Sequence, residues 1–374
     1  MVQPAMSFVP SGTAGSMQVA VLEATGKLVI KHGLIPEPSP DEVRVRIQYV
    51  GICGSDLEAF RGLRSPEFMA TPTRLGHEVA GVLDAVGARV HGLEVGERVT
   101  CRYVWGAFAE YIVCKPFNVL TLPRSVPALE VSLIEVLPGI IHAVELARIT
   151  PHTSVLIMGQ GVSGLVMTQV ARLHSPRVLA VTDLKPRNLT LGRAYGATHA
   201  YRLPHEHAST MEALRADHPG GFEVVIPCLL DGDGMRDALD AVALGGRIIL
   251  YGCIGTCRDF DFFKMHRKRC EIHSTEPKRD IDMRRYFDEG RRLVTQGLIN
   301  TSEMVTHVYP LSRVQEAFEL RNDKSPEGEA IHVMIDCSAG AAENIVVCPG
   351  GGGKAREEEA ATAAAAAGAA RTCC

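Results

Sequence analysis

A glycine-rich segment near the middle of the chain constrains the fold more than any other feature. It begins with a short apolar run, 155–158, which predicts a buried strand, and continues with three glycines in the spacing G-x-G-x-x-G. Gly159 permits a tight turn, Gly161 lets a pyrophosphate approach bare backbone, and Gly164 lets the following helix pack closely on the strand. Free N–H groups at the helix start, from Val162 onward, favour an anion. The segment therefore predicts a dinucleotide-binding turn.

The residues that follow favour this interpretation over a chance glycine turn and a surface aspartate. A second apolar run ends in Asp183, 19 residues after Gly164. An acid about 20 residues beyond the glycines can bind a ribose 2′-hydroxyl, and its charge would repel a 2′-phosphate. Asp183 therefore favours NAD over NADP, although the nearby cations Lys185 and Arg187 weaken that preference.

Strand and helix patterns alternate through this part of the chain, which predicts an α/β fold with a doubly wound parallel sheet. After Asp183 we expect helices at 188–195, 235–244 and 279–296 and strands at 222–230 and 246–252. A helix is also expected before the glycine motif, at 132–148, and Pro138 should kink or interrupt it.

The first third of the chain has a different character. Short β-like runs separated by turn residues extend from residue 17 to about residue 123, and residues 42–50 alternate strictly between polar and apolar. Such alternation with frequent glycine predicts a largely β, barrel-like domain. Short strands return after residue 298, and we expect them to pack on this first domain.

Length and composition are those of a two-domain globular protein. A chain of 374 residues exceeds what one hydrophobic core usually supports, and 46% of its residues are hydrophobic. The formal net charge of −4 gives no reason to expect a nucleic-acid partner. No apolar run is long enough to span a membrane and no signal peptide opens the chain, so we expect a cytoplasmic protein without a membrane partner. The 11 cysteines include no C-x-x-C pair, which argues against a disulfide framework.

A second group of chemically active residues lies in the β-rich part. Cys53, Ser55 and Asp56 share one loop, and His77 and Glu78 follow, the histidine 24 residues after the cysteine. In these motifs the chain resembles the medium-chain dehydrogenase/reductase superfamily, in its zinc-dependent alcohol and polyol dehydrogenase branch. The resemblance is greatest to sorbitol, threonine and related sugar-alcohol dehydrogenases. It implies a GroES-like, β-rich catalytic domain joined to a Rossmann domain.

The resemblance runs from about residue 17 to residue 337 and gives the domain boundaries. We expect a disordered extension at 1–16, the catalytic domain at 17–150, the NAD-binding Rossmann domain at 151–297, a return to the catalytic domain at 298–337, and a disordered tail at 338–374. The tail is rich in glycine and alanine and carries no apolar core pattern.

The resemblance also assigns a single catalytic zinc ion per chain. Cys53 matches the thiolate ligand, His77 the imidazole ligand and Glu135 the carboxylate ligand or a water-bridged carboxylate. One thiolate, one imidazole and one carboxylate leave a fourth position open, as catalytic zinc requires. Glu78 matches a glutamate that is a ligand in some members and lies behind the ligands in others, so the sequence leaves the choice between Glu78 and Glu135 open. Val136 departs from the usual Glu-Pro-Leu motif.

Two further departures from the family concern the proton path and subunit contacts. The resemblance makes Ser55 the acceptor of the substrate proton, but Glu58 stands where a relay histidine is usual. A glutamate can also carry protons, so Ser55, Glu58 and Glu78 are the predicted catalytic residues. The segment 100–106 replaces the lobe with four cysteines that holds a structural zinc in relatives, and only Cys101 remains. We expect a homodimer or higher homo-oligomer, although this lobe contributes to subunit contacts in relatives.

Residues at the ends of later strands complete the predicted cofactor site. The resemblance suggests that the backbones of Cys228, Gly252 and Cys253 flank the nicotinamide, because they follow parallel strands at the carboxyl edge of the sheet, where ligands bind. Four residues are expected to line the substrate pocket: Phe60, Arg61, Trp105 and Phe108.

These features together predict a zinc-dependent, NAD-linked oxidoreductase. It would interconvert a secondary alcohol of a polyol, sugar or cyclitol with its ketone by hydride transfer. Two alternatives remain open on the sequence: a zinc-free, NADPH-dependent quinone or enone reductase of the same fold, and a non-catalytic NAD-binding protein. The combination of Cys53, His77 and Glu135 argues against the first, and the intact glycine motif argues against loss of activity.

Overall fold

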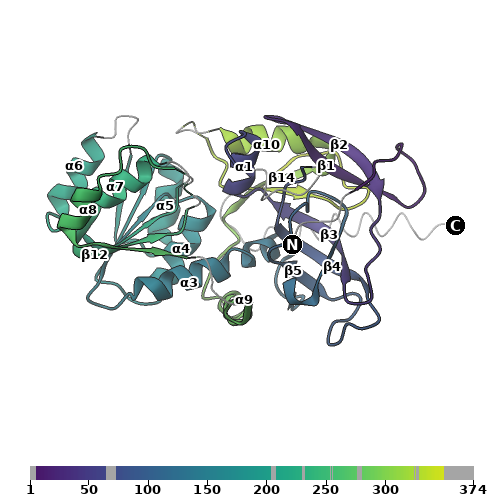
Figure 1. Ribbon diagram of the computed structural model, residues 1–374, viewed down its shortest axis with the longest axis horizontal. Helices are drawn as coiled ribbons and strands as arrows, with labels where there is room; N and C mark the ends of the chain where they lie inside the picture. Colours follow the sequence, from purple (N-terminus) through teal and green to yellow (C-terminus); the bar gives the residue numbers. More distant parts are fainter. Residues whose placement is uncertain are drawn as a thin grey trace.

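The computed structural model contains two lobes side by side (Figure 1), each built on its own sheet. It describes residues 6–64, 73–203, 208–229, 232–252, 254, 256–275, 280–323, 325 and 328–348. Within these ranges no helix combines the length and the apolar composition that crossing a bilayer requires.

The Rossmann lobe is a six-stranded sheet in which every neighbouring pair is parallel. Its strand order is β10 (His199–Arg202), β9 (Val178–Asp183), β8 (Ser154–Met158), β11 (Phe222–Pro227), β12 (Val242–Leu250) and β13 (Glu271–Ser274). The chain order reverses at β8, which is where a doubly wound sheet opens a crevice for a ligand. The predicted α/β fold is confirmed.

Helices cover both faces of this sheet, and β8 supplies side chains to a core on each side. Val155 and Ile157 pack in one core, whereas Leu156 and Met158 pack in the other. This alternation explains why the run is apolar throughout, since both faces of the strand are buried. The helices are α3 (Leu137–Ala147), α4 (Val162–Arg172), α5 (Pro186–Ala194), α6 (Ala208–Asp217), α7 (Asp233–Ala241) and α8 (Phe262–Lys268).

The β-rich lobe is organised around an eight-stranded mixed sheet. Its order is β16 (Val346–Val347), β14 (Val305–Pro310), β15 (His332–Asp336), β3 (Val43–Gly51), β4 (Glu78–Val86), β5 (Arg98–Cys101) and β7 (Val119–Leu122), with β6 (Tyr111–Cys114) paired to β3. A separate hairpin consists of β1 (Ser16–Ala24) and β2 (Lys27–Leu34). Because β15 pairs with β3, the chain returns to this lobe after the Rossmann sheet.

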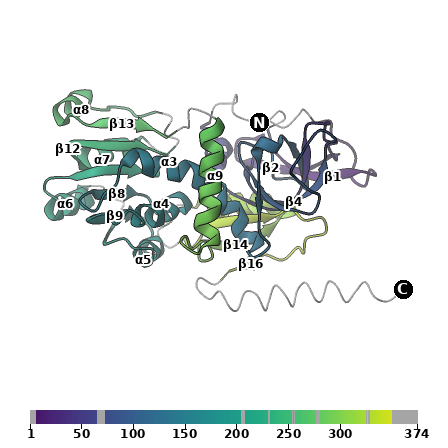
Figure 2. The same cartoon turned by 90° about the horizontal axis from the view of Figure 1, so that it is seen from below.

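Two helical segments connect the lobes. The helix expected at 132–148 is divided into α2 (Ala128–Val131), a 3-10 turn η3 (Ser132–Ile134) and α3, and Pro138 lies in the first turn of α3, where its missing N–H costs nothing. Helix α9 (Asp280–Thr295) stands between the two sheets in Figure 2. Its Arg284 donates to the carbonyl of Val119 in β7, and its Tyr286 donates to Glu145 of α3.

Parts of the predicted disordered ends are ordered in the structure. The backbone N–H of Val9 donates to His32 at 2.9 Å and Phe8 pairs with Gly33, while β16 pairs with β14. The edges of β2 and β14 present unpaired N–H and C=O groups, which explains why short flanking segments add to them. Residues 1–5 and 349–374 of the predicted disordered segments lie outside the described residues.

Candidate active site

Three potential metal ligands converge at one end of the β-rich lobe. The ligand atoms of Cys53, His77 and Glu78 all lie within 4.8 Å of one another. Cys53 follows β3 and caps α1 (Gly54–Phe60), whereas Glu78 is the first residue of β4. The antiparallel register pairs Gly51 with Glu78, so the sheet itself brings the two distant loops together.

Asp56 fixes the two loops that carry these ligands, and sequence analysis assigned it no role. One carboxylate oxygen accepts the backbone N–H of Cys53 at 3.0 Å, and the other accepts that of Gly76 at 3.0 Å. The latter oxygen also lies 3.7 Å from Nδ1 of His77. The acid three residues after the helix cap is a capping-box pattern, which was the available signal.

The electrostatics of the cluster suit a cation. Burial opposes ionisation of the Cys53 thiol, but the neighbouring His77 outweighs it and lowers the thiol pKa. Burial and the nearby Cys53 raise the pKa of Glu78 well above its ordinary value. Nδ1 of His77 and Oε2 of Glu78 are buried and have no hydrogen-bond partner among the described residues. A thiolate, an imidazole and a carboxylate with unpaired buried atoms are a donor set that fits zinc.

Glu135, the other predicted carboxylate ligand, lies outside this group of three. Its carboxylate accepts a hydrogen bond from the guanidinium of Arg102 at 2.9 Å, and both side chains are largely buried. Its charge nevertheless acts on Glu78, so it lies close to the cluster. Its role as a ligand stays a prediction.

His332 lies directly behind the cluster and was missed by sequence analysis. It is fully buried, with Nε2 3.5 Å from Oε2 of Glu78, and burial lowers its pKa to about 3. A Cβ on Gly51 would lie 2.2 Å from Oε2 of Glu78 and 2.4 Å from Nε2 of His332, so a larger residue at this position would displace one or both of these side chains. A lone histidine in a strand carries no sequence signal for such a place.

The predicted proton-path residues lie on α1 beside the cluster. Ser55 Oγ is buried and has no hydrogen-bond partner among the described residues. Glu58 lies 3.5 Å from the guanidinium of Arg64, and burial raises its pKa. Trp105 packs beside the site, with its ring centroid 4.3 Å from that of His77, and Arg64 lies over its ring. The arrangement leaves a serine hydroxyl and a partly buried carboxyl group on the same helix.

The four residues expected to line the substrate pocket lie in different surroundings. Trp105 lies at the cluster, but the rings of Phe60 and Phe108 pack against Phe318 at 5.2 and 5.5 Å and belong to the hydrophobic core. Arg61 donates to Asn322 of α10 (Val314–Asn322). The aromatic surface of Phe60 and Phe108 thus closes the core under α1, and their place in a pocket wall stays a prediction.

On the Rossmann side, the three glycines occupy the positions that their spacing predicts. Gly159 has a φ of +88°, a conformation that favours glycine, and Gly161 caps α4, which begins at Val162. A Cβ on Gly164 would lie 1.8 Å from the carbonyl oxygen of Gly159, whereas a Cβ on Gly161 would meet nothing within 4 Å. Gly164 thus serves helix packing, and the open space at Gly161 is available to a ligand.

Asp183 lies at the carboxyl end of β9, beside the glycine turn. Its carboxylate accepts the backbone N–H of Gln160 at 2.6 Å and that of Lys185 at 2.8 Å. It therefore fixes the turn itself, a role that sequence analysis did not assign. A carboxylate has further acceptor capacity, so contact with a ribose hydroxyl stays a prediction.

The remaining predicted cofactor residues follow β11 and β12. The backbone N–H of Cys228 donates to Met158 at 2.8 Å, and that of Gly252 donates to Pro227 at 3.0 Å, which places both at the carboxyl edge near the glycine turn. Cys253 lies outside the described residues. Tyr251, next to Gly252, interacts with Ser163 of α4 and with the charge of Cys53.

The metal-type cluster and the carboxyl edge of the sheet face each other across the lobes. The charges of Cys53, Glu78 and Asp183 all act on the half-buried guanidinium of Arg321 in α10, whose pKa is lowered by its burial. Arg321 therefore lies close enough to both halves of the candidate site for their charges to act on it, and sequence analysis missed it.

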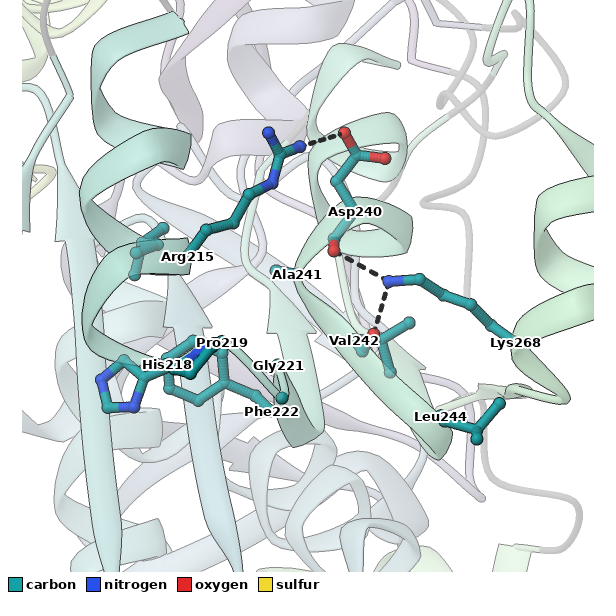
Figure 3. A pocket seen from close by; sticks show the side chains of 12 residues that line it. Arg215, His218, Pro219, Gly221, Phe222, Asp240, Ala241, Val242, Leu244 and Lys268 are labelled. Carbon is teal, nitrogen blue, oxygen red and sulfur yellow. Dashed lines mark hydrogen bonds and ion pairs between the residues drawn. The ribbon is translucent and has the colours of Figure 1, made fainter.

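A separate cavity of about 260 Å³ lies at the opposite edge of the Rossmann sheet (Figure 3), where β11 and β12 begin. Its charged groups are satisfied within the protein. Arg215 donates to the carboxylate of Asp240 at 2.9 Å, and Lys268 donates to the carbonyls of Asp240 and Val242 at 2.8 and 2.6 Å. Ligands of open α/β sheets bind at the carboxyl edge, so this cavity is not the cofactor site.

Comparisons with known proteins match part of each lobe to a different protein family. Residues 39–124 match the family described as Alcohol dehydrogenase GroES-like domain, and residues 163–281 match the family described as Zinc-binding dehydrogenase. The chain is 29% identical to sorbitol dehydrogenase of Bacillus subtilis over 342 residues, covering 81% of this chain and 93% of that protein. It is 27% identical to L-idonate 5-dehydrogenase of Vitis vinifera over 346 residues, covering 83% and 92%. Among solved structures, an Escherichia coli oxidoreductase/dehydrogenase of unknown specificity involved in membrane biogenesis superposes with a TM-score of 0.75 at 26% identity, covering 87% of this chain and 100% of that one.

Proposed function

The chain belongs to the medium-chain dehydrogenase/reductase superfamily, and we propose that it is a zinc-dependent, NAD-linked dehydrogenase. It interconverts a secondary alcohol of a polyol, sugar or cyclitol with its ketone by hydride transfer. The relatives named sorbitol dehydrogenase and L-idonate 5-dehydrogenase support this substrate class. Zinc, NAD, the cytoplasmic location and a homo-oligomeric state are parts of the proposal.

The observation that carries the proposal is the convergence of Cys53, His77 and Glu78 within 4.8 Å. We assign these three as the zinc ligands, with Glu78 in the place that sequence analysis gave to Glu135. Three protein ligands leave one coordination position for substrate. His332 supports Glu78 from behind, and Asp56 supports the loops of the other two ligands.

A bound zinc ion would supply Lewis acidity, which makes a substrate hydroxyl easier to ionise. Ser55 accepts the hydroxyl proton, because its Oγ is buried and lies beside Cys53. Glu58 passes the proton toward solvent. Its carboxylate pairs with the guanidinium of Arg64 at 3.5 Å, which holds it in position. Burial raises the pKa of Glu58, which brings it closer to working pH than that of an exposed glutamate.

The Rossmann side binds and orients the nicotinamide cofactor. The bare backbone at Gly161 and the start of α4 bind the phosphates, and Asp183 binds the ribose and disfavours a 2′-phosphate. Gly252 and Tyr251 hold the nicotinamide end of the cofactor near Cys53. Tyr251 lies close enough to Cys53 for the charge of that residue to act on its hydroxyl group.

The direct test is the zinc content of the purified, tag-free protein, measured by elemental mass spectrometry. We expect about one zinc per chain, lost in Cys53→Ser. Trp105 offers a second readout: it is the only tryptophan in the chain and lies 4.3 Å from His77, so its fluorescence should change on zinc binding in the wild type but not in the variant. Wild-type protein without zinc would instead favour the zinc-free enone reductase. Turnover of simple long-chain alcohols with no activity on polyols would refute the substrate class.

The non-catalytic alternative is tested by cofactor binding. NAD should raise the melting temperature of the wild-type protein, because a ligand that binds only the native state stabilises it. Failure of NAD to shift that temperature would contradict both the dehydrogenase and the NAD-binding interpretations.

A further inference from the structure

Arg102 holds the carboxylate that the metal cluster does not use. One nitrogen of its guanidinium, Nη1, donates both to Oε1 of Glu135 at 2.9 Å and to the backbone carbonyl of the same residue at 2.7 Å. The side chains retain only 14% and 6% of their exposure. Two bonds from one cation to one residue fix both the carboxylate and the turn that carries it.

Arg102 is itself held in place by its surroundings. Its backbone exchanges two hydrogen bonds with Asn118, since its N–H donates to the Asn118 carbonyl at 2.9 Å and its carbonyl accepts from Nδ2 of Asn118 at 2.9 Å. Its guanidinium lies 4.9 Å from the ring centroid of Tyr103. The cation is therefore fixed before any ligand binds.

Glu135 would otherwise be free to approach the cluster. It follows η3, which packs on the strands β3 and β4 that lead to Cys53 and begin with Glu78. Its negative charge already acts on Glu78, although it is not among the three residues whose ligand atoms converge. Arg102 is the cation with which Glu135 pairs among the described residues, and a buried carboxylate that loses its partner is destabilised unless it reaches another positive charge. With zinc bound, that charge is the metal.

We propose that Arg102 is a positioning residue that holds Glu135 away from the metal and so keeps the fourth coordination position open for substrate. The inference rests on the proposed function, because it assumes a zinc ion bound by Cys53, His77 and Glu78. Four protein ligands make a closed, structural type of zinc site, whereas three with an open position make a catalytic one. Removal of the Arg102 charge converts the open, catalytic type of zinc site into the closed, structural type.

The test uses the full-length protein loaded with Co²⁺ in place of zinc, in four forms: wild type, Arg102→Met, Glu135→Gln, and the double variant with both substitutions. Azide, which binds an open cobalt position, is titrated and followed by the visible absorption of the metal. We expect azide to bind the wild type, Glu135→Gln and the double variant with similar affinity. Arg102→Met should bind azide about 10- to 100-fold more weakly, because Glu135 occupies the position.

The rate of polyol oxidation with NAD should follow the same order as the azide affinity. It should fall in Arg102→Met and recover in part in the double variant. If Arg102→Met does not fold, Arg102→Gln replaces it, since an amide keeps a donor to the Glu135 carbonyl. Equal azide affinity in the wild type and the Arg102 variant would overturn the inference. So would a weakened affinity that Glu135→Gln does not restore. Failure of the wild type to bind one Co²⁺ per chain would overturn the proposed zinc function, and this inference with it.

Discussion

One carboxylate oxygen of Asp56 accepts the backbone N–H of Gly76 at 3.0 Å, across 20 residues of chain. The other oxygen accepts the N–H of Cys53, so a single side chain joins the loop of the proposed thiolate ligand to the loop of the proposed imidazole ligand. Asp56 is 1% exposed, which makes these bonds costly to break. The geometry of the proposed metal site thus depends on a residue that is not itself a proposed ligand.

Substitution Asp56→Ala should therefore weaken zinc binding. We expect the affinity to fall about 10- to 100-fold, because the ligand loops lose the group that orients them. Competition with a chelator measures the change. Asp84→Ala is the matched control, since Asp84 pairs with Arg44 on the outer part of β4. Zinc affinity in the Asp56 variant equal to that of the control would contradict the prediction.

The glycine motif gives a pair of substitutions with opposite expectations. Gly164→Ala should lower stability by about 1 to 3 kcal/mol, the usual cost of overpacking, because the new Cβ would collide with the carbonyl of Gly159. Gly161→Ala should leave the melting temperature unchanged, because its Cβ meets nothing, but should weaken NADH binding. Thermal unfolding and NADH fluorescence titration separate the two effects. Wild-type NADH affinity in Gly161→Ala would show that the phosphates bind elsewhere.

Substitution of Asp183 should change cofactor preference. In Asp183→Ser the negative charge is lost and Lys185 remains, so the ratio of kcat/KM for NADP over NAD should rise at least about tenfold, which is roughly 1.4 kcal/mol. Asp183→Asn is the companion variant, because its side chain can still accept the N–H of Gln160 and thus preserve the turn. An unchanged preference in both variants would mean that Asp183 only shapes the turn.

The pH dependence of alcohol oxidation should follow Glu58. Burial raises the pKa of this carboxyl group, with Arg64 and Arg61 opposing the shift. Glu58 can accept a proton only when it is ionised, so the rate should rise as the pH passes its pKa. Glu58→Gln should remove this acid limb and lower kcat by about 100-fold. Glu58→His should restore an acid limb to the pH–rate profile, shifted to higher pH. An unaltered pH profile in Glu58→Gln would exclude this route for the proton.

His332 should make the fold sensitive to acid. Burial, assisted by the charge of Arg321, lowers its folded pKa from 6.5 to about 3. Between these two values the unfolded chain binds a proton that the folded chain does not, so stability is lost as the pH falls below 6.5. Between pH 6.5 and about pH 5 the free energy of unfolding, measured with urea, should decrease in both proteins. The decrease should be about 2 kcal/mol smaller in His332→Phe than in the wild type. Parallel losses in the two proteins would refute this assignment.

Periodic patterns predicted most of the fold. The strict alternation at 42–50 became β3, and the motif around Gly161 became the turn between β8 and α4, because each pattern reflects a local rule. The pairing of Phe8 with Gly33 was not predictable, since it depends on a free strand edge supplied by another part of the chain. Patterns within a segment cannot identify such an edge.

The candidate site was predictable only where motif and geometry coincide. Cys53, His77 and Glu78 converge because antiparallel β3 and β4 place their loops together. The partner of Glu135 was not predictable, because Arg102 lies 33 residues away in a segment whose path the sequence does not define. His332 reaches Glu78 only through the pairing of β15 with β3, which joins regions almost 300 residues apart.

The pairing of β15 with β3 also has a consequence for the order in which the protein forms during synthesis. The strands of the Rossmann sheet come from one continuous stretch, 154–274, so their pairing needs no residue from the end of the chain. Strand β3 must wait for residues 332–336, so the loops of Cys53 and Glu78 lack their final neighbour until almost all of the described chain has been made. The Rossmann strands can therefore pair before the last strand beside the proposed metal site has been made.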